Sequence, residues 1–386
     1  MSTPPESRIP VGRIISATGF KTTLGGGTLP EVVRLAMQEA SSSTFQPDRL
    51  QAWAGEAISE ATGSESGWIT AGAAAGITMA TAACIAGKGL AAMEALPAPT
   101  DPRAEIIIQR GHRNSYDRAF RNAGARLVEV GFPHIEGIGL TYEWQLEAAF
   151  TERTVAVAHV AIADDDGVPL ERVCEIASAH GVPVIVDAAA ELPPVSNLRR
   201  FVEAGAAVVT FSGGKAIRGP QGSGIFAARR DIVESVRLQT LDMDVDVARW
   251  VADEGGEPPH HGMGRTMKIG NEQIVGAVVA LQEFVRRDHE AESAEQRRWL
   301  EDDVVPAVAG LGEATVRADM HFYPRLVVSG MGSELARDRI DRLANGTPSI
   351  IVAHAPQARG ELVVLPEAIA IQDRVLVQEA LAALPR

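Results

Sequence analysis

The sequence predicts an α/β protein with a mostly parallel sheet in a large domain, followed by a smaller α+β domain. From about residue 68 to residue 228, short β-branched runs alternate with helical patterns, as repeated crossover units require. Several of these runs lack polar alternation, which is typical of parallel strands covered on both faces. The length of 386 residues, with 46% hydrophobic and 22% charged residues, fits a globular chain of two or three packed units.

The elements of the large domain follow from these patterns. Strands are predicted at residues 68–70, 105–109, 127–130, 155–162, 182–187 and 206–211. A helix at residues 169–180 places Leu170, Val173, Cys174 and Ala177 on one face, and Gly181 follows as a stop signal. The uncharged run at 71–87 is rich in Ala, Gly and Thr, so we expect a small-residue helix buried in the protein.

A different pattern begins after residue 270. Ile274, Val278, Leu281 and Val285 form an apolar stripe on a helix that reaches residue 287. Beyond it we expect strands at 325–328, 349–354 and 361–365 and helices at 334–343 and 372–384. This mixed order predicts residues 1–45 as an amino-terminal segment that joins the small domain, 46–268 as the large domain and 269–386 as the small domain.

Charge and composition exclude several classes of protein. The net charge of −14 argues against a nucleic-acid partner, because phosphate binding requires a positive field. The first twenty residues contain no apolar run long enough for a signal peptide, and the run at 71–87 is too weakly hydrophobic to span a membrane. The two cysteines, Cys84 and Cys174, lie in apolar stretches, which predicts reduced thiols in a cytoplasmic protein.

Three predicted strand ends carry groups that suit chemistry. A glycine-rich turn at 71–76 joins a strand to a helix, where free backbone N–H groups form a phosphate cradle. Asp187 ends one strand, and Lys215 follows another on a turn flanked by glycines. An unpaired ammonium is costly to bury, so we interpret Lys215 as the Schiff-base lysine of a carbonyl cofactor. Asp187 lies one crossover unit upstream, where a carboxylate would keep the pyridine nitrogen of pyridoxal phosphate protonated.

Each of these features also has a plainer interpretation. The turn at 71–76 is compatible with ordinary strand–helix packing, and Asp187 with a loop cap. The surroundings of Lys215 do not match a phosphate loop of nucleotide-binding proteins, and no G-x-G-x-x-G follows a strand, which argues against a dinucleotide oxidoreductase. The acidic run at 164–166 is expected to be a solvated turn, His260 and His261 a mobile loop, and no spacing matches structural zinc.

Six segments make the resemblance to a known family specific. They are TLGGGTLPEV (23–32), TAGAAAG (70–76), QRGHRNSYDRAF (109–120), HGVPVIVDAAAELPP (180–194), FSGGKAIRGPQGSG (211–224) and GMGRTMKIG (262–270). In these segments the chain resembles fold-type I pyridoxal phosphate enzymes, in the branch related to bacterial selenocysteine synthase and D-glucosaminate-6-phosphate ammonia-lyase. The likeness covers roughly residues 10–285, and the lysine segment is its most specific part.

The resemblance implies a role for each residue of a cofactor site. Lys215 would form the Schiff base with pyridoxal 5'-phosphate, and Asp187 would pair with the pyridine nitrogen. The remaining assignments are the phosphate-binding backbone of Gly72, Ala73 and Ala74, the phosphate-binding hydroxyl of Ser212, His112 stacked on the ring, and Ala189 on the opposite face. His112 is equally open to interpretation as a solvated loop histidine.

The substrate side of the site is less defined. Arg325 is the candidate for binding the substrate carboxylate and Arg265 is its competitor, and a surface salt bridge is as good an interpretation for either. No metal is expected. The predicted partners are a small amino acid substrate and a second copy of the chain, in a homodimer or a larger homo-oligomer, without nucleic acid or membrane.

The resemblance predicts a lyase that removes the α-proton of a small hydroxyamino acid or amino sugar acid and eliminates the β-hydroxyl, giving a 2-oxo acid and ammonia. A racemase, an aldolase or a transaminase remains the alternative, because all begin with the same carbanion. A noncatalytic binding protein is less favoured, since Lys215 and Asp187 are both present. Selenocysteine synthesis on tRNA is not expected with a charge of −14 and no basic amino-terminal extension.

Overall fold

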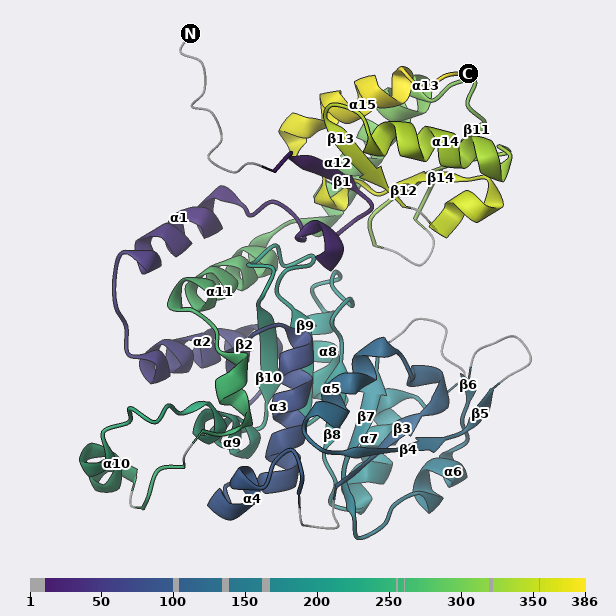
Figure 1. Cartoon of the computed structure of the whole chain (residues 1–386). Coiled ribbons are helices and arrows are strands. Elements are labelled where there is room, and N and C mark those ends of the chain that lie inside the picture. Colours follow the sequence, from purple (N-terminus) through teal and green to yellow (C-terminus); the bar gives the residue numbers. More distant parts are fainter. Residues whose placement is uncertain are drawn as a thin grey trace. The chain divides into compact units, whose positions relative to one another are not determined.

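The computed structural model describes residues 11–99, 104–133, 139–161, 167–254, 256–259, 261–318, 322–353 and 355–386. The contacts between Cα atoms divide the chain into two units (Figure 1). The larger unit is Leu29–Arg287, and the smaller unit joins Asp288–Arg386 to the described residues before Leu29. These limits fall after residues 28 and 287, whereas the sequence predicts limits after residues 45 and 268.

A seven-stranded, mostly parallel sheet forms the larger unit, and this confirms the predicted fold class. Its order is β2 (Ser66–Thr70), β10 (Gly224–Ala228), β9 (Val208–Ser212), β8 (Val184–Asp187), β7 (Thr154–Val160), β3 (Glu105–Gln109) and β4 (Arg126–Val130). The six predicted strands are all present, and their ends differ from the prediction by at most two residues. Only β10 runs antiparallel to its neighbours in this sheet, and the sequence patterns did not indicate it.

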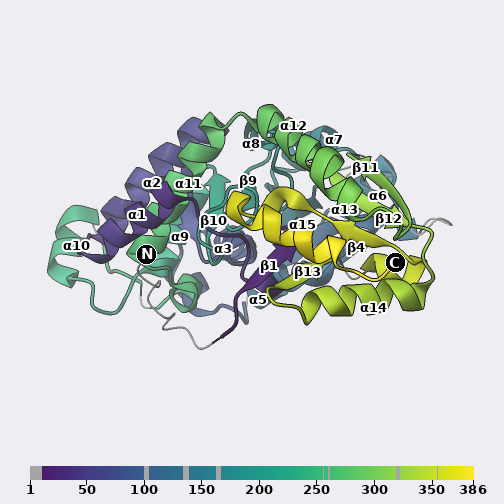
Figure 2. The same cartoon turned by 90° about the horizontal axis from the view of Figure 1, so that it is seen from above.

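Helices cover both faces of this sheet. One face packs with α3 (Ala73–Ala86), α5 (Arg118–Asn122) and α9 (Arg230–Thr240). The strand residues that alternate with that core face α2 (Pro47–Thr62), α7 (Leu170–Ala179) and α8 (Asn197–Glu203). Figure 2 shows α1 (Glu31–Ser41) and α11 (Asn271–Arg286) beside α2. The shorter elements are α4 (Leu90–Glu94), α6 (Glu143–Ala148), α10 (Val247–Glu254) and a hairpin of β5 (Phe132–Pro133) and β6 (Gly139–Leu140).

Helix α3 confirms the expected buried helix of small residues. Nearly all of its side chains are buried, because it lies along the strands of the sheet (Figure 1). Its hydroxyls are satisfied internally: Thr78 Oγ1 donates to Ala119 O at 2.9 Å, and Thr81 Oγ1 donates to Ile77 O at 2.9 Å. Among the helices in the described residues, none is long and apolar enough to cross a bilayer.

The smaller unit has its own core. Its antiparallel sheet has the order β11 (Glu313–Arg317), β12 (Arg325–Ser329) and β14 (Leu362–Val364), and β1 (Ile14–Ala17) pairs in parallel with β13 (Ser349–Val352). The helices are α12 (His289–Trp299), α13 (Val305–Ala307), α14 (Ser333–Ala344) and α15 (Arg374–Ala382). Apolar side chains from both ends of the chain, such as Ile15, Leu326 and Val377, meet in one core.

Candidate active site

The strand ends of the larger unit bring the predicted residues to one edge of the sheet. Strand register pairs Asp187 with Thr210 on β9 and with Val160 on β7. Gly224, at the start of β10, pairs with Thr70 at the end of β2 and with Ser212 at the end of β9. The β2–α3 turn, Asp187 and the Lys215 turn therefore open onto the same edge, where ligands of parallel sheets bind.

The amino terminus of α3 is built for close approach to a ligand. Gly72 precedes the helix with φ +95°, a conformation that favours glycine, and a Cβ added there would point into open space. No side chain of the described residues caps this helix, so the first N–H groups of α3 point outward at the positive end of its dipole. Gly72, Ala73 and Ala74 thus present the features of an anion cradle.

Gly224 supports this cradle from the neighbouring strand. A Cβ at Gly224 would lie 2.5 Å from Gly72 C and 2.7 Å from Ala73 N, both of them backbone atoms. Only glycine allows β10 to start so close to the first turn of α3. Gly224 was not among the predicted site residues, although its position at the end of the glycine-rich GPQGSG run could have indicated a close backbone approach.

The Lys215 turn is a closed loop of backbone hydrogen bonds. Gly213 N donates to Ser223 O at 2.9 Å, Gly219 N donates to Gly213 O at 2.8 Å and Arg218 N donates to Lys215 O at 2.8 Å. Arg218 has φ +61°, a strained conformation for a residue with a side chain. This loop holds the partly buried Lys215 directly after β9.

Asp187, Lys215 and Glu191 form one electrostatic cluster. Burial raises the pKa of the Asp187 carboxyl, whereas the N–H of Ala189, 3.1 Å from Asp187 Oδ1, and the charge of Lys215 lower it. Burial lowers the pKa of the Lys215 amine, and the carboxylates of Asp187 and Glu191 act in the opposite direction. A lysine with a lowered pKa has more of the neutral amine that reacts with carbonyl groups.

These residues fit pyridoxal phosphate by their chemistry. The cofactor needs an amine for its aldehyde, a carboxylate for its pyridine nitrogen and N–H donors for its phosphate. Lys215, Asp187 and the uncapped start of α3 supply these three groups at one edge of the sheet. Asp187, which is 9% exposed, is a buried acid whose pKa is raised, so a cationic partner would stabilise its charge. Ser212, at the end of β9, and Ala189 are partly buried beside this cluster.

His112 is held inside the protein beside the end of β7. It follows β3, is 1% exposed, and its Nδ1 accepts a hydrogen bond from Val160 N at 3.3 Å. Its ring meets the ring of His159 edge-on, with 4.5 Å between the ring centroids. His112 is therefore not a solvated histidine, and because Val160 pairs with Asp187, it lies close to the edge that carries the cluster.

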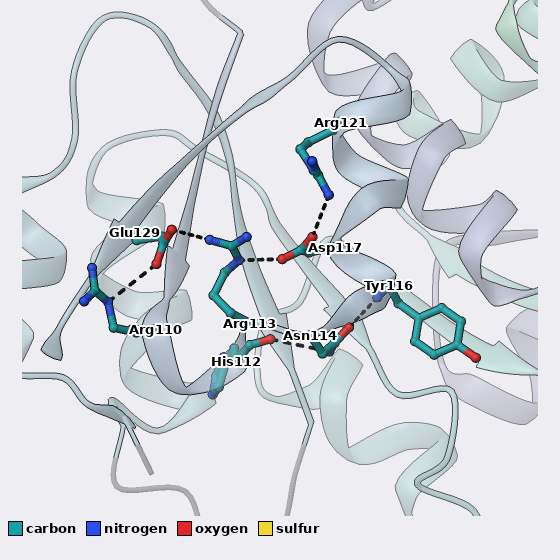
Figure 3. A network of polar contacts seen from close by, with 8 residues as sticks. All are labelled: Arg110, His112, Arg113, Asn114, Tyr116, Asp117, Arg121 and Glu129. Atoms are coloured by element: carbon teal, nitrogen blue, oxygen red, sulfur yellow. Dashed lines mark hydrogen bonds and ion pairs between the residues drawn. The ribbon is translucent and has the colours of Figure 1, made fainter. Parts of the chain in front are cut away.

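A network of ion pairs fixes the segment that follows His112 (Figure 3). Arg113 lies between two carboxylates: its Nε is 2.5 Å from Asp117 Oδ2, and its guanidinium also pairs with Glu129 on β4. Arg110 Nε lies 3.5 Å from Glu129 Oε2, and Arg121 reaches Asp117 at 3.4 Å. The hydrogen bond and charge of Asp117 and Glu129 raise the pKa of Arg113, so this clamp stays charged.

The two candidate substrate arginines occupy different environments. Arg265 lies in a 3₁₀ helix, and its Nε is 2.5 Å from Asp242 Oδ2. It lines a cavity of about 990 Å³ that also includes Thr70 and Ala71 of the β2–α3 turn. Arg325 is the first residue of β12 in the smaller unit, partly buried and paired in register with Arg317.

The remaining predictions concern residues away from this cluster. His261 is exposed, and its charge contributes to lowering the pKa of Asp242. His260 and the acidic run at 164–166 lie outside the described residues. Within the described residues, no group of three or more His, Cys, Asp or Glu side chains is arranged to hold a metal. Burial raises the pKa of both Cys84 and Cys174 to about 12, as expected for unreactive thiols.

Comparisons with known proteins identify relatives of this chain among known enzymes. The sequence profile described as Aminotransferase class-V matches residues 35–253. A 5'-C-glycyluridine monooxygenase-decarboxylase of Streptomyces sp is 33% identical over 376 residues, 92% of this chain and 86% of that protein. A D-glucosaminate-6-phosphate ammonia lyase of Salmonella typhimurium is 33% identical over 279 residues, 70% of this chain and 68% of that protein.

Solved structures and more distant relatives complete the comparison. The structure of a D-glucosaminate-6-phosphate ammonia-lyase superposes with a TM-score of 0.82 at 28% identity, and the match covers 100% of this chain and 98% of that one. An L-seryl-tRNA(Sec) selenium transferase of Geotalea daltonii is 26% identical over 261 residues, but the match covers only 59% of this chain and 52% of that protein.

Proposed function

The chain belongs to the aminotransferase class-V family, and from this premise we propose that it eliminates the β-hydroxyl of an amino sugar acid or a small hydroxyamino acid, forming a 2-oxo acid and ammonia. It is a fold-type I, pyridoxal phosphate-dependent enzyme. The observation that carries the proposal is the likeness to an ammonia-lyase structure over 100% of this chain, at a TM-score of 0.82.

Each residue of the strand-end cluster has a separate role in the proposed reaction. When bound, pyridoxal phosphate accepts the electron pair released at the substrate Cα. Lys215 holds the cofactor and, once free, its amine takes the proton from Cα. Burial supports this, because it lowers the pKa of Lys215. The Asp187 carboxylate keeps a proton on the pyridine nitrogen, and the backbone of Gly72, Ala73 and Ala74 binds the phosphate.

The flanking residues complete this proposed site. Ser212 would add a hydroxyl to the phosphate, and His112 and Ala189 would contact opposite faces of the cofactor ring. The hydrogen bond from Ala189 N to Asp187 supports the position of Ala189, and the network around Arg113 supports a fixed His112 segment. We further propose that Arg325 binds the substrate carboxylate, with Arg265, which pairs with Asp242, as its competitor.

A substrate panel tests the reaction. Purified enzyme is incubated with D-glucosaminate, its 6-phosphate, and D- and L-isomers of serine and threonine, while ammonia and 2-oxo acid are measured. We expect both products in equal amounts, and in deuterated water the oxo acid carries deuterium at the former leaving-group carbon. A racemase would return substrate labelled at Cα without ammonia. A transaminase would need a keto-acid acceptor, and an aldolase would release an aldehyde.

One relative supports a second candidate reaction, an oxidative decarboxylation. The protein named a monooxygenase-decarboxylase is 33% identical over 92% of this chain, a longer match than that of the ammonia lyase. Both reactions require the electron pair at Cα, so the cluster around Lys215 serves either. Oxygen uptake and CO₂ release, measured with the same panel, separate them: an elimination consumes no oxygen and keeps the carboxylate.

The setting of the enzyme is part of the proposal. We propose a cytoplasmic homodimer or larger homo-oligomer that acts on a small amino acid. A noncatalytic role is disfavoured because Lys215 and Asp187 occur together in the cluster. The selenium transferase relatives do not lead us to a tRNA substrate, since the chain carries a net charge of −14 and spans about half of their length.

A further inference from the structure

We propose that Glu191 is the catalytic acid that protonates the leaving hydroxyl, an inference that rests on the elimination proposed above. Glu191 lies four residues after Asp187, in the segment that follows β8. Its backbone is fixed at both polar groups: Glu191 N donates to Ala188 O at 3.2 Å, and Asn197 Nδ2 donates to Glu191 O at 2.6 Å. The side chain is therefore carried by a defined turn at the ligand-binding edge of the sheet.

Within the cluster, Asp187 and Lys215 have other proposed roles, and Glu191 does not. Asp187 Oδ1 is engaged by Ala189 N, and Lys215 is the amine of the site. The Glu191 side chain is partly buried, and no hydrogen bond links its carboxyl to another described residue. The charged groups that act on it are Arg200 from α8, Lys215 and Asp187. The charges of Lys215 and Asp187 both act on the Glu191 carboxyl. We infer from this that Glu191 lies near both groups, where it could contact a bound substrate.

The direction in which the pKa of Glu191 is shifted suits a general acid. Burial raises the pKa of its carboxyl, the nearby Asp187 carboxylate raises it further, and Arg200 and Lys215 lower it. A general acid works best when its pKa is close to the working pH. Two carboxyl groups in one site can divide the roles of charge partner and proton donor, and the raised pKa of Glu191 favours its protonated form.

The histidines near the site are poorer donors. His112 is assigned to one face of the cofactor ring in the proposed site, and the hydrogen bond from Val160 N to its Nδ1 fixes it for that role. His261 is exposed, and its charge acts on Asp242. The Glu191 carboxylate, in contrast, acts on the pKa of the Lys215 amine.

The step balances with these groups alone. The Cα–H bond breaks and its proton goes to the Lys215 amine, while the electron pair forms the Cα=Cβ bond. The Cβ–O bond breaks, the oxygen keeps the bonding pair, and the Glu191 proton converts it to water. In the enamine product, Lys215 returns its proton to Cβ and the nitrogen loses one, which restores Glu191. Uptake of one water then releases the 2-oxo acid and ammonia, with no net oxidation.

The test compares Glu191→Gln, which keeps the shape and removes the acidic proton, with Glu203→Gln, an exposed glutamate on α8, as the matched control. Each holoenzyme is given D-glucosaminate 6-phosphate in deuterated water, and Cα exchange and ammonia release are followed together. Ammonia is also measured from D- and L-β-chloroalanine, because chloride leaves without a proton. Circular dichroism and cofactor absorbance check that each variant folds and is loaded.

We expect Glu191→Gln to slow ammonia release from the hydroxyl substrate by about 10²-fold or more, with Cα exchange and chloride elimination within about threefold of wild type. The control should match wild type in every measurement.

Two results would overturn the assignment. They are unchanged ammonia release in Glu191→Gln, and an equal loss of Cα exchange and ammonia release. The proposed elimination itself is tested separately, by Cα exchange and ammonia release of the wild-type enzyme. If wild type exchanges Cα but releases no ammonia from any hydroxyl substrate, the elimination fails first, and the role of Glu191 fails with it.

Discussion

Lys215 combines burial with opposite charges, and this combination makes its role testable at a single residue. The chain has only four lysines, Lys21, Lys88, Lys215 and Lys268. We expect borohydride reduction of the holoenzyme to attach the cofactor to Lys215, because burial lowers the pKa of that amine. Peptide mapping identifies the modified lysine. Lys215→Ala should lose the cofactor absorbance band and turnover together, whereas the exposed Lys88→Ala should keep both.

Asp187 should have opposite effects on stability and on catalysis. Burial raises its folded-state pKa above the ordinary value of 3.8, so the cofactor-free protein loses stability as pH rises through that raised pKa. Asp187→Asn removes this cost and keeps an oxygen for the Ala189 N–H. We therefore expect the cofactor-free variant to melt at the same temperature as wild type near pH 4 and at an equal or higher temperature at pH 8.

Catalysis by the loaded Asp187→Asn enzyme should fall by about 10²-fold or more, the scale of one preorganised electrostatic partner. Thermal melts of both proteins at the two pH values and initial rates of the holoenzymes provide the measurements. A near-normal rate, or a cofactor-free variant that melts well below wild type at pH 8, would contradict the role assigned to this carboxylate.

Some site residues could be predicted from the sequence and others could not. The cluster of Asp187 and Lys215 could be predicted because both follow apolar strands whose ends must meet at one edge. Glu191 was not predicted, since its role depends on a turn that folds it back toward Lys215. The apolar stripe on α11 was partly wrong: Val285 is 43% exposed, whereas Phe284, at 0%, is buried with Ala277 and Ala280 on the adjacent side of the helix.

Among the elements, β10 is the one on which the proposed phosphate cradle depends. Gly224→Ala would place a Cβ 2.5 Å from Gly72 C and 2.7 Å from Ala73 N, so the start of α3 must shift. We expect at least tenfold weaker binding of pyridoxal phosphate, measured by titration of absorbance. Gly222→Ala is the matched control, because a Cβ there meets only Gln273 Nε2 at 3.5 Å. Equal affinity of the two variants would show that the approach of β10 is not needed.

The same element shows a limit of reading strands from composition. Residues 224–228, GIFAA, contain one β-branched residue and begin immediately after a glycine-rich turn, so no pattern marked them. They form a strand because they fill the space between β2 and β9, a tertiary effect. The parallel strands were predictable since burial on both faces leaves a continuous apolar run.

For the whole molecule, the fold class followed from the order of the elements, but the assembly state does not follow from one chain. The larger unit leaves apolar side chains on the outer face of α1, where Val32 is 45% and Leu35 is 56% exposed. Exposed apolar surface of this kind often marks a protein interface.

We therefore expect light scattering to give at least twice the chain mass of 40.9 kDa. Leu35→Glu should weaken the association and reduce activity with it, because a charge on an apolar interface must be desolvated. Ile371→Glu is the control, since Ile371 is 76% exposed but lies in the smaller unit, away from α1 in the sequence and outside the predicted interface. An enzyme that is strictly monomeric at its working concentration and fully active would rule out the dimer, and equal effects of the two substitutions would rule out α1 as the contact.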